Sequence, residues 1–203
     1  MLTLKPLSPI MNRPVFYRLW QAPFVDAKFA PIIRHNRLAD VRQVLDVGCG
    51  PGTCARFFRD QSYLGVDHNP DYIATARRNH PGRFVVGDAC SFVADDPDGF
   101  DFILLNSLLH HIGTVDVRRM LSRLHDQLAP NGHVHILDLV LPATPSIARF
   151  LARSDRGDYP RPWSAWLELF RSAFDEVVCE PYTVRCCGIP LWNMIYFKGR
   201  RQT

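Results

Sequence analysis

The chain has 203 residues, of which 47% are hydrophobic and 22% are charged, and its formal net charge is +4. This length allows one well-packed domain and is short for two. The positive charge forms no block of like charges, so the sequence predicts neither a nucleic-acid partner nor an anionic-membrane surface.

The first part of the chain is rich in aromatic residues, which take helical spacing in the second half of residues 14–38. We expect this part to form a helical cap placed before the first strand. Its aromatic side chains are Phe16, Tyr17, Trp20, Phe24 and Phe29.

Short apolar runs then alternate with longer amphipathic ones. Strands are predicted at residues 44–47, 63–66, 83–86, 100–105 and 133–140, and helices at 53–59, 70–79 and 115–128. The tripeptide Pro130-Asn131-Gly132 is expected to separate the last helix from the fifth strand. This alternation indicates βαβ units and a parallel sheet with helices on both faces.

The C-terminal part differs from the middle. A helix is predicted at 163–174, and strands at 176–185 and 191–198 are joined by a short link. Two successive strands with a short link form an antiparallel pair, which we expect at the sheet edge. The predicted fold class is therefore α/β: a Rossmann-like, doubly wound sheet of seven strands, mostly parallel with an antiparallel C-terminal strand.

A glycine-rich loop follows the first strand in the run VLDVGCGPG, residues 44–52. Glycines at 48, 50 and 52 let a ligand lie directly on the backbone, and a helix N-terminus after them offers free N–H groups. A dinucleotide fingerprint would place its third glycine at position 53, where this chain has threonine. The spacing therefore argues against a pyrophosphate ligand.

Three aspartates stand at or near the ends of three successive strands. Asp46 lies two residues before the loop, where it suits a cationic amine and would repel a pyrophosphate. Asp67 ends the second strand, where it can accept hydrogen bonds from both hydroxyls of a ribose, and Asp88 follows the third strand. Ligands of open α/β sheets bind across these carboxyl ends, so we expect the three carboxylates in one site.

The motifs VLDVGCGPG, GVDHN and GDA, in this order, resemble those of the class I S-adenosylmethionine-dependent methyltransferases, and the resemblance extends through FDFILLNSLLHHI and LAPNGHVHIL. It covers residues 43–141 and implies S-adenosylmethionine as cofactor. It also implies a division of the chain, treated as one domain of residues 1–203, into the cap (1–42), a cofactor-binding core (43–141) and an acceptor-side insertion with the C-terminal strands (142–203).

The resemblance implies a role for most of these residues. Gly48, Gly50 and Asp46 would surround the methionine part of the cofactor, and Asn106 would lie near its amino group. Asp67 would hold the ribose, with Asp88 and Ala89 at the adenine. The full predicted cofactor set is Tyr17, Asp46, Gly48, Cys49, Gly50, Asp67, His68, Asp88, Ala89 and Asn106.

The acceptor side is predicted from residues after the fourth and fifth strands. His110 and His111 are candidates for a general base or for orienting the acceptor, because imidazole titrates near neutral pH. Asp138 is expected at the same edge, and Arg156 or Arg161 could hold an anionic acceptor. The sequence Asn106-Ser-Leu-Leu lacks the Asn-Pro-Pro-aromatic pattern of adenine-methylating enzymes, so we predict a small-molecule acceptor methylated on oxygen, nitrogen or carbon.

The cysteine spacing and the length of the apolar stretches bear on metal binding and on cellular location. The six cysteines show no metal-binding spacing, so we expect reduced, mostly buried thiols and metal-independent catalysis. Residues 1–14 do not resemble a signal peptide, and the apolar stretch at 102–109 is too short to span a bilayer, which favours a cytoplasmic protein.

Three alternatives remain open at this point. One is a nicotinamide-dependent oxidoreductase on a similar sheet. Another is a cofactor-binding protein that has lost transfer activity, and the third is an enzyme that uses S-adenosylmethionine for a non-transfer reaction. The oligomeric state is not predicted.

Overall fold

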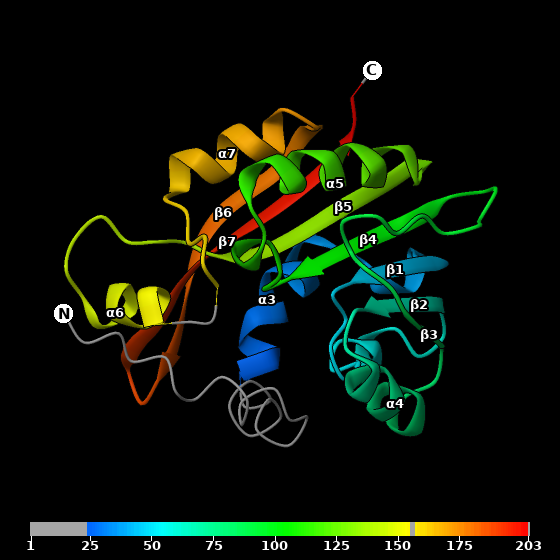
Figure 1. The fold of residues 1–203 in the computed structure, drawn as a ribbon, viewed down its shortest axis with the longest axis horizontal. Coiled ribbons are helices and arrows are strands. Elements are labelled where there is room, and N and C mark those ends of the chain that lie inside the picture. Colours follow the sequence, from blue (N-terminus) through cyan, green and yellow to red (C-terminus); the bar gives the residue numbers. More distant parts are fainter. Residues whose placement is uncertain (1–23, 155–156, 203) are drawn as a thin grey trace.

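A seven-stranded sheet runs through the middle of the computed structural model, which describes residues 24–154 and 157–202 (Figure 1). The strand order is β3-β2-β1-β4-β5-β7-β6, and β7 runs opposite to the other six strands. The strands are β1 (Gln43–Val47), β2 (Ser62–Asp67), β3 (Arg83–Val86), β4 (Phe100–Asn106), β5 (Leu128–Leu139), β6 (Phe174–Cys186) and β7 (Ile189–Arg201). The predicted fold class is confirmed.

Helices cover both faces of this sheet (Figure 1). The α-helices are α3 (Val25–His35), α4 (Pro70–Asn79), α5 (Thr114–Asp126), α6 (Ile147–Ser154) and α7 (Trp163–Arg171). Side chains alternate along β1: Leu45 and Val47 join an apolar cluster with α5 and α7, whereas Val44 joins a second cluster with α3 and α4. The two hydrophobic cores therefore lie on opposite faces of one sheet.

The segment after the glycine loop differs from the prediction. The helix expected at 53–59 is a single 3₁₀ turn, Ala55–Phe57. Phe57 stacks on Phe29 of α3 with 4.0 Å between ring centroids, and Phe58 packs edge-on against the same ring at 5.9 Å. Both adjacent aromatic side chains thus pack on one ring of α3, and the segment forms only this short turn.

The boundary of β5 also differs from the prediction. The strand begins at Leu128, so the expected break at residues 130–132 lies inside it as an irregularity in the β4–β5 pairing. Gly132 makes this possible, because a Cβ at that position would meet the Phe100 carbonyl oxygen at 2.3 Å. A glycine that permits close approach of two strands was therefore mistaken for a turn residue.

The histidine His135 is buried in β5 with little contact to water. Its ring stacks on Phe102 at 3.7 Å between centroids, and its Nδ1 lies 3.0 Å from the Tyr196 hydroxyl, which accepts a hydrogen bond from Asn36 Nδ2. Burial, together with the charge of Lys198, holds the pKa of His135 well below its ordinary value of 6.5. The folded protein therefore keeps this imidazole neutral.

We expect the pH dependence of stability to report on this group. Below pH 6.5 the unfolded chain binds a proton that folded His135 rejects, so stability falls as the pH falls, by up to about 1.4 kcal/mol per pH unit. His135→Phe should flatten this slope in urea unfolding between pH 5 and 6.5, whereas His68→Gln, at a side chain that is 85% exposed, should not. Equal slopes for wild type and His135→Phe would contradict the assignment.

Candidate active site

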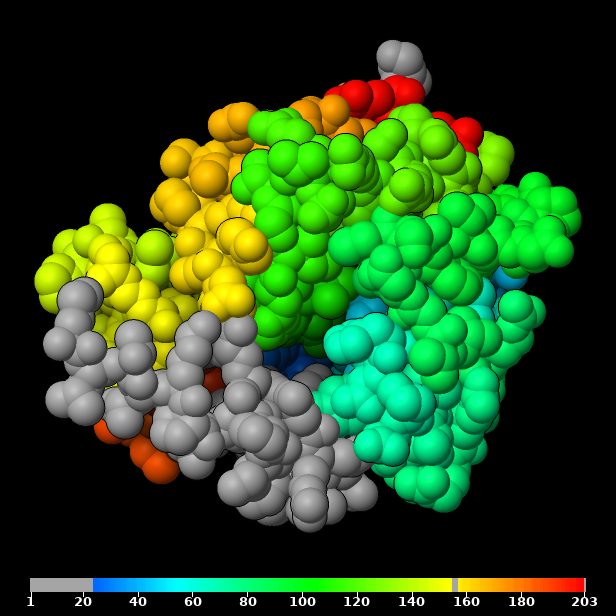
Figure 2. All heavy atoms as spheres, in the orientation of Figure 1, coloured from blue at the N-terminus to red at the C-terminus, as the bar shows by residue number. Residues whose placement is uncertain are grey.

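The carboxyl ends of β1, β2, β4 and β5 meet at one edge of the sheet. Figure 2 shows a hollow on this part of the surface, between the green atoms after β4 and the cyan atoms after β1, with blue atoms of α3 at its floor. Asp46, Asp67, Asn106 and Asp138 lie at or near these four strand ends, so the sheet brings these four residues to one edge.

The glycine loop is held against β2 by its own backbone. The N–H groups of Gly48 and Cys49 both donate to the Val66 carbonyl oxygen, at 2.8 and 3.0 Å. Gly48 has φ +75°, and a Cβ there would meet Leu108 Cδ1 at 2.8 Å. The positive φ therefore favours glycine at this position, and any larger residue would also have to displace the Leu108 side chain.

Asp67 is buried at the end of β2 and is oriented by two backbone donors. The Gly50 N–H donates to Oδ2 at 2.9 Å, and the Asn69 N–H donates to Oδ1 at 2.8 Å. Each oxygen retains a further acceptor site, which suits a pair of ribose hydroxyls. The neighbouring His68 is largely exposed, with Nδ1 3.6 Å from Asp67 Oδ1.

Asp46 is buried in β1 and accepts a hydrogen bond from the Tyr63 hydroxyl of β2. Burial raises the pKa of Asp46 to about 7, although the Tyr63 hydrogen bond opposes this and the nearby Asp67 carboxylate reinforces it. The carboxyl group is therefore poised to ionise beside a bound cation.

The affinity for a cationic ligand should consequently depend on pH. We expect S-adenosylmethionine to bind more tightly as the pH rises through about 7, because its amino group favours the Asp46 carboxylate; below that pH the affinity should fall by up to about tenfold per unit. Calorimetric titration from pH 5.5 to 8.5 measures this, and Asp46→Asn is the control that should remove the dependence. A variant that keeps the wild-type slope would exclude Asp46 as its origin.

The residues after β3 are more open to solvent than those after β2. Asp88 is exposed, and its carboxylate accepts from the Cys90 N–H at 3.0 Å and from Ser91 Oγ at 2.9 Å. Ala89 is half-buried against the core that contains α5. Both residues thus lie in a short turn beside the site. Neither provides a buried carboxylate such as that of Asp67.

A chain of polar contacts leads from Asn106 to α3. Ser107 Oγ lies 3.2 Å from Asn106 Oδ1 and 3.1 Å from the ammonium group of Lys28, which is buried and lies 5.3 Å from the ring centroid of Trp192. Ser107 has φ +56°, a strained value for serine that points to a functional position. The contact between Lys28 and Ser107 was not predicted from the sequence.

His110 and Asp138 form a buried pair. His110 Nδ1 lies 2.6 Å from Asp138 Oδ1, and the Leu109 and Leu139 N–H groups donate to the same carboxylate at 2.7 Å. Burial would raise the pKa of Asp138, but His110 and the two backbone donors lower it below its ordinary value. His111 is exposed, with its ring 4.1 Å from that of His110.

Arg161 has a different position from the one predicted. It is buried and donates to the Leu109 carbonyl at 3.0 Å, to the Ile112 carbonyl at 2.7 Å and to Thr114 Oγ1 at 3.2 Å. Its guanidinium group thus holds the loop between β4 and α5 instead of facing an acceptor. Arg156 lies outside the described residues, and so does Tyr17 with the rest of residues 1–23.

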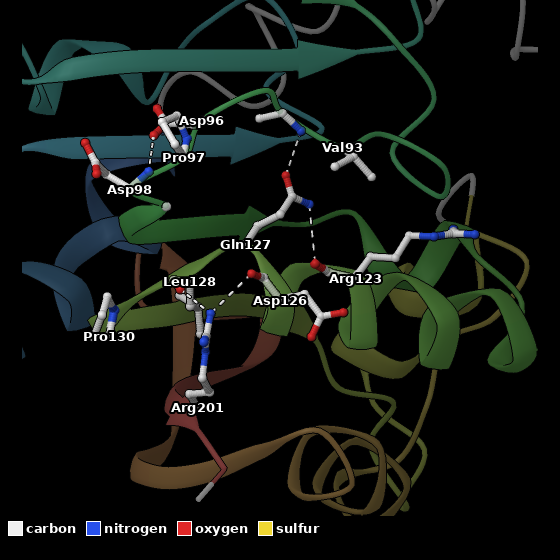
Figure 3. A pocket seen from close by; sticks show the side chains of 12 residues that line it. Val93, Asp96, Pro97, Asp98, Arg123, Asp126, Gln127, Leu128, Pro130 and Arg201 are labelled. Carbon is white, nitrogen blue, oxygen red and sulfur yellow. Dashed lines mark hydrogen bonds between the residues drawn. The ribbon is translucent and has the colours of Figure 1, made fainter.

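A cavity of about 480 Å³ lies away from this edge, near the amino ends of β4 and β5 (Figure 3). Arg201 donates to the Asp126 and Leu128 carbonyls there, and the Gln127 side chain accepts from the Ala94 N–H at 2.7 Å. The Arg201 Nη2 and Gln127 Oε1 atoms are thus bound to the chain itself, whereas the buried Arg201 Nε has no hydrogen-bond partner within the described residues. Within the described residues no helix could span a membrane, and no group of three or more His, Cys, Asp or Glu could hold a metal ion.

The residues at the carboxyl edge fit S-adenosylmethionine. Asp46 offers a buried carboxyl group for the cationic amine, and Asp67 offers further acceptor sites for the ribose. A methyltransferase domain model matches residues 44–132. The trans-aconitate 2-methyltransferase of Delftia acidovorans is 33% identical over 185 residues, which cover 82% of this chain and 67% of that enzyme.

The chain belongs to the class I S-adenosylmethionine-dependent methyltransferases. Solved structures agree on the fold. A methyltransferase from Methanosarcina mazei has a TM-score of 0.68 at 16% identity, covering 85% of this chain and 98% of its own. Human N-acetylserotonin methyltransferase, solved in complex with the cofactor, has a TM-score of 0.67 at 16% identity, covering 98% of this chain and 60% of its own.

These findings decide several predictions. The family and the cofactor S-adenosylmethionine are confirmed, and the nicotinamide-dependent oxidoreductase is set aside. The individual site residues and the division into one domain with three parts remain predictions. The enzyme spans 67% of the Delftia relative and 44% of a second trans-aconitate 2-methyltransferase, from Methylobacterium nodulans, that is 31% identical.

Proposed function

We propose that this methyltransferase transfers a methyl group to a carboxylate oxygen of a small organic acid. The observation that carries the proposal is the buried ammonium group of Lys28, one hydrogen bond from Ser107 at the carboxyl end of β4. A cation in this position attracts an anionic acceptor and repels a cationic one. The relatives' named acceptor, trans-aconitate, is itself a carboxylic acid.

The chemistry of a carboxylate suits the other residues of the site. When bound, S-adenosylmethionine supplies its methyl group as an electrophile. A carboxylate attacks through a lone pair without losing a proton, so Lys28 and Ser107 need only orient it, and alignment provides most of the catalysis. A general base at His110 is not required, which agrees with its burial against Asp138.

The three predicted catalytic residues then divide into two roles. His110 and Asp138 act as positioning residues for the loop after β4, because they bond to each other and to its backbone. His111, whose side chain is exposed, is the candidate for contact with the acceptor.

We place the enzyme in the cytoplasm, where its six free cysteines would stay reduced.

Transfer of a labelled methyl group to a panel of acceptors tests the proposal. Trans-aconitate and other small di- and tricarboxylates should be methylated, whereas amines and phenols of similar size should not. Lys28→Met should raise the KM for the acid by about tenfold or more and leave cofactor binding unchanged, while Lys28→Arg should keep most of the activity. Preference for an amine or a phenol would overturn the carboxylate proposal.

Failure to methylate any acceptor of the panel, with intact cofactor binding, would favour the silent binding protein or the non-transfer enzyme. A calorimetric titration run beside the transfer assay separates these outcomes from simple loss of the folded protein.

A further inference from the structure

The β6–β7 hairpin extends past the strand beside it. Pairing between β5 and β7 ends at Leu139 and Met194, whereas pairing between β6 and β7 continues to Cys186 and Ile189. The hairpin therefore ends in a two-stranded ribbon, which Figure 1 shows in orange-red below the sheet.

The tip of this ribbon carries two adjacent cysteines. Cys186 is the last residue of β6, Cys187 begins the turn, and both are exposed. The other four cysteines are buried or half-buried, so the expectation of buried thiols is wrong only for this pair. Cysteine is among the residue types most often found fully buried, and two exposed neighbours therefore need a reason.

The backbone of Cys187 is strained. Its φ is +49°, and that of Gly188 is +80°, as in a type I′ hairpin turn. The first of these positions favours asparagine, aspartate or glycine, and the Cβ of another residue costs about 1 kcal/mol there. Stability does not explain a cysteine at this position, and such an outlier points to a function of the side chain.

The two thiols can act as one unit. Cys186 and Cys187 are consecutive residues at the exposed end of the hairpin, so one small ligand can be reached by both sulfur atoms. The neighbouring Cys187 thiol raises the pKa of Cys186. A protonated thiol reacts slowly with ordinary alkylating agents. A soft metalloid atom that carries two hydroxide groups can still react with two protonated thiols. The atom binds both sulfur atoms, and the two hydroxides take up both protons.

We propose that Cys186 and Cys187 form a vicinal-dithiol site that binds trivalent arsenic compounds. With an arsonous acid, two S–As bonds form and two As–O bonds break, and the two thiol protons leave with the two hydroxides as water. No electrons are transferred, so the step needs no oxidant. Arsenic(III) is a soft, thiophilic centre that prefers sulfur to the oxygen and nitrogen ligands of the surrounding turn.

The test uses the reduced full-length chain and phenylarsine oxide, followed by intact-mass measurement. One equivalent should add, and a dithiol such as 2,3-dimercaptopropanol should remove it where a monothiol at the same concentration does not. Cys186→Ser and Cys187→Ser should each weaken binding by at least about 100-fold, because one S–As bond and the ring are lost. Cys90→Ser and Cys179→Ser are the matched controls that should bind as wild type.

Cys187→Asn provides a second variant with an independent readout. Asparagine favours the left-handed turn, so this variant should be as stable as wild type or more stable, and yet it should fail to retain the arsenical. Persistence of the adduct in a Cys186→Ser/Cys187→Ser double variant would overturn the proposal and direct attention to the buried Cys49 and Cys54. Absence of a dithiol-reversible adduct in the wild type would also overturn it.

Discussion

Replacing Asp67 with alanine is expected to weaken S-adenosylmethionine binding by about 100-fold, because two ribose hydroxyls lose a charged hydrogen-bond acceptor. The same change frees the Gly50 and Asn69 N–H groups, which orient the glycine loop against the end of β2. Calorimetric titration with the cofactor and with its demethylated product measures the loss directly.

Asp101 offers a matched control for this variant. Its carboxylate also accepts from two backbone donors, Arg42 N–H at 2.9 Å and Gln43 N–H at 3.0 Å, but it lies at the opposite, amino end of β4. Asp101→Ala should lower the free energy of unfolding and leave cofactor affinity within about twofold of wild type. Equal losses of affinity in the two variants would show that Asp67 acts through stability alone.

Replacing Arg161 with methionine is expected to impair methyl transfer by about 10- to 100-fold while cofactor affinity stays near wild type. The change leaves the Leu109 and Ile112 carbonyls without their donor and releases the loop that carries His110 and His111. Steady-state kinetics should show the loss in KM for the acceptor, in kcat, or in both, since loop position affects both.

Arg149 supplies the comparison for Arg161. It also donates to backbone carbonyls, those of Pro142 and Ala143, but these lie within the segment after β5 and not in the histidine loop. Arg149→Met should therefore leave transfer nearly unchanged. If both variants impaired methyl transfer equally, the effect would not depend on the histidine loop. Arg161 would then have no specific role in positioning that loop.

The sequence predicted the sheet well because its signals are local. The apolar runs of β1, β2 and β3 each close on a glycine or an acid, and the helix Pro70–Asn79 has the bounds expected from its pattern. The prediction failed where packing between distant segments decided the structure. Phe57 and Phe58 leave the helical pattern because Phe29, far along the chain, offers both of them a contact.

The residues of the site also fall into a group that the sequence could predict and a group that it could not. The carboxylates at strand ends could be predicted, since parallel topology brings such ends to one edge. The partners that orient or neutralise them could not. Lys28 meets Ser107 across 79 positions and Arg161 meets Leu109 across 52, and no spacing rule connects residues so far apart. Tyr63 likewise meets Asp46 only because β1 and β2 are neighbours.

The strand order has a consequence for synthesis on the ribosome. β7 is the last of the seven strands to be made, yet it lies between β5 and β6. Until it emerges, β5 presents an unpaired edge, and the core lacks Ile195 and Phe197. The nascent chain can therefore assemble its cofactor half early, but it cannot close its sheet before the final strand is released, and a chaperone would find its binding surface there.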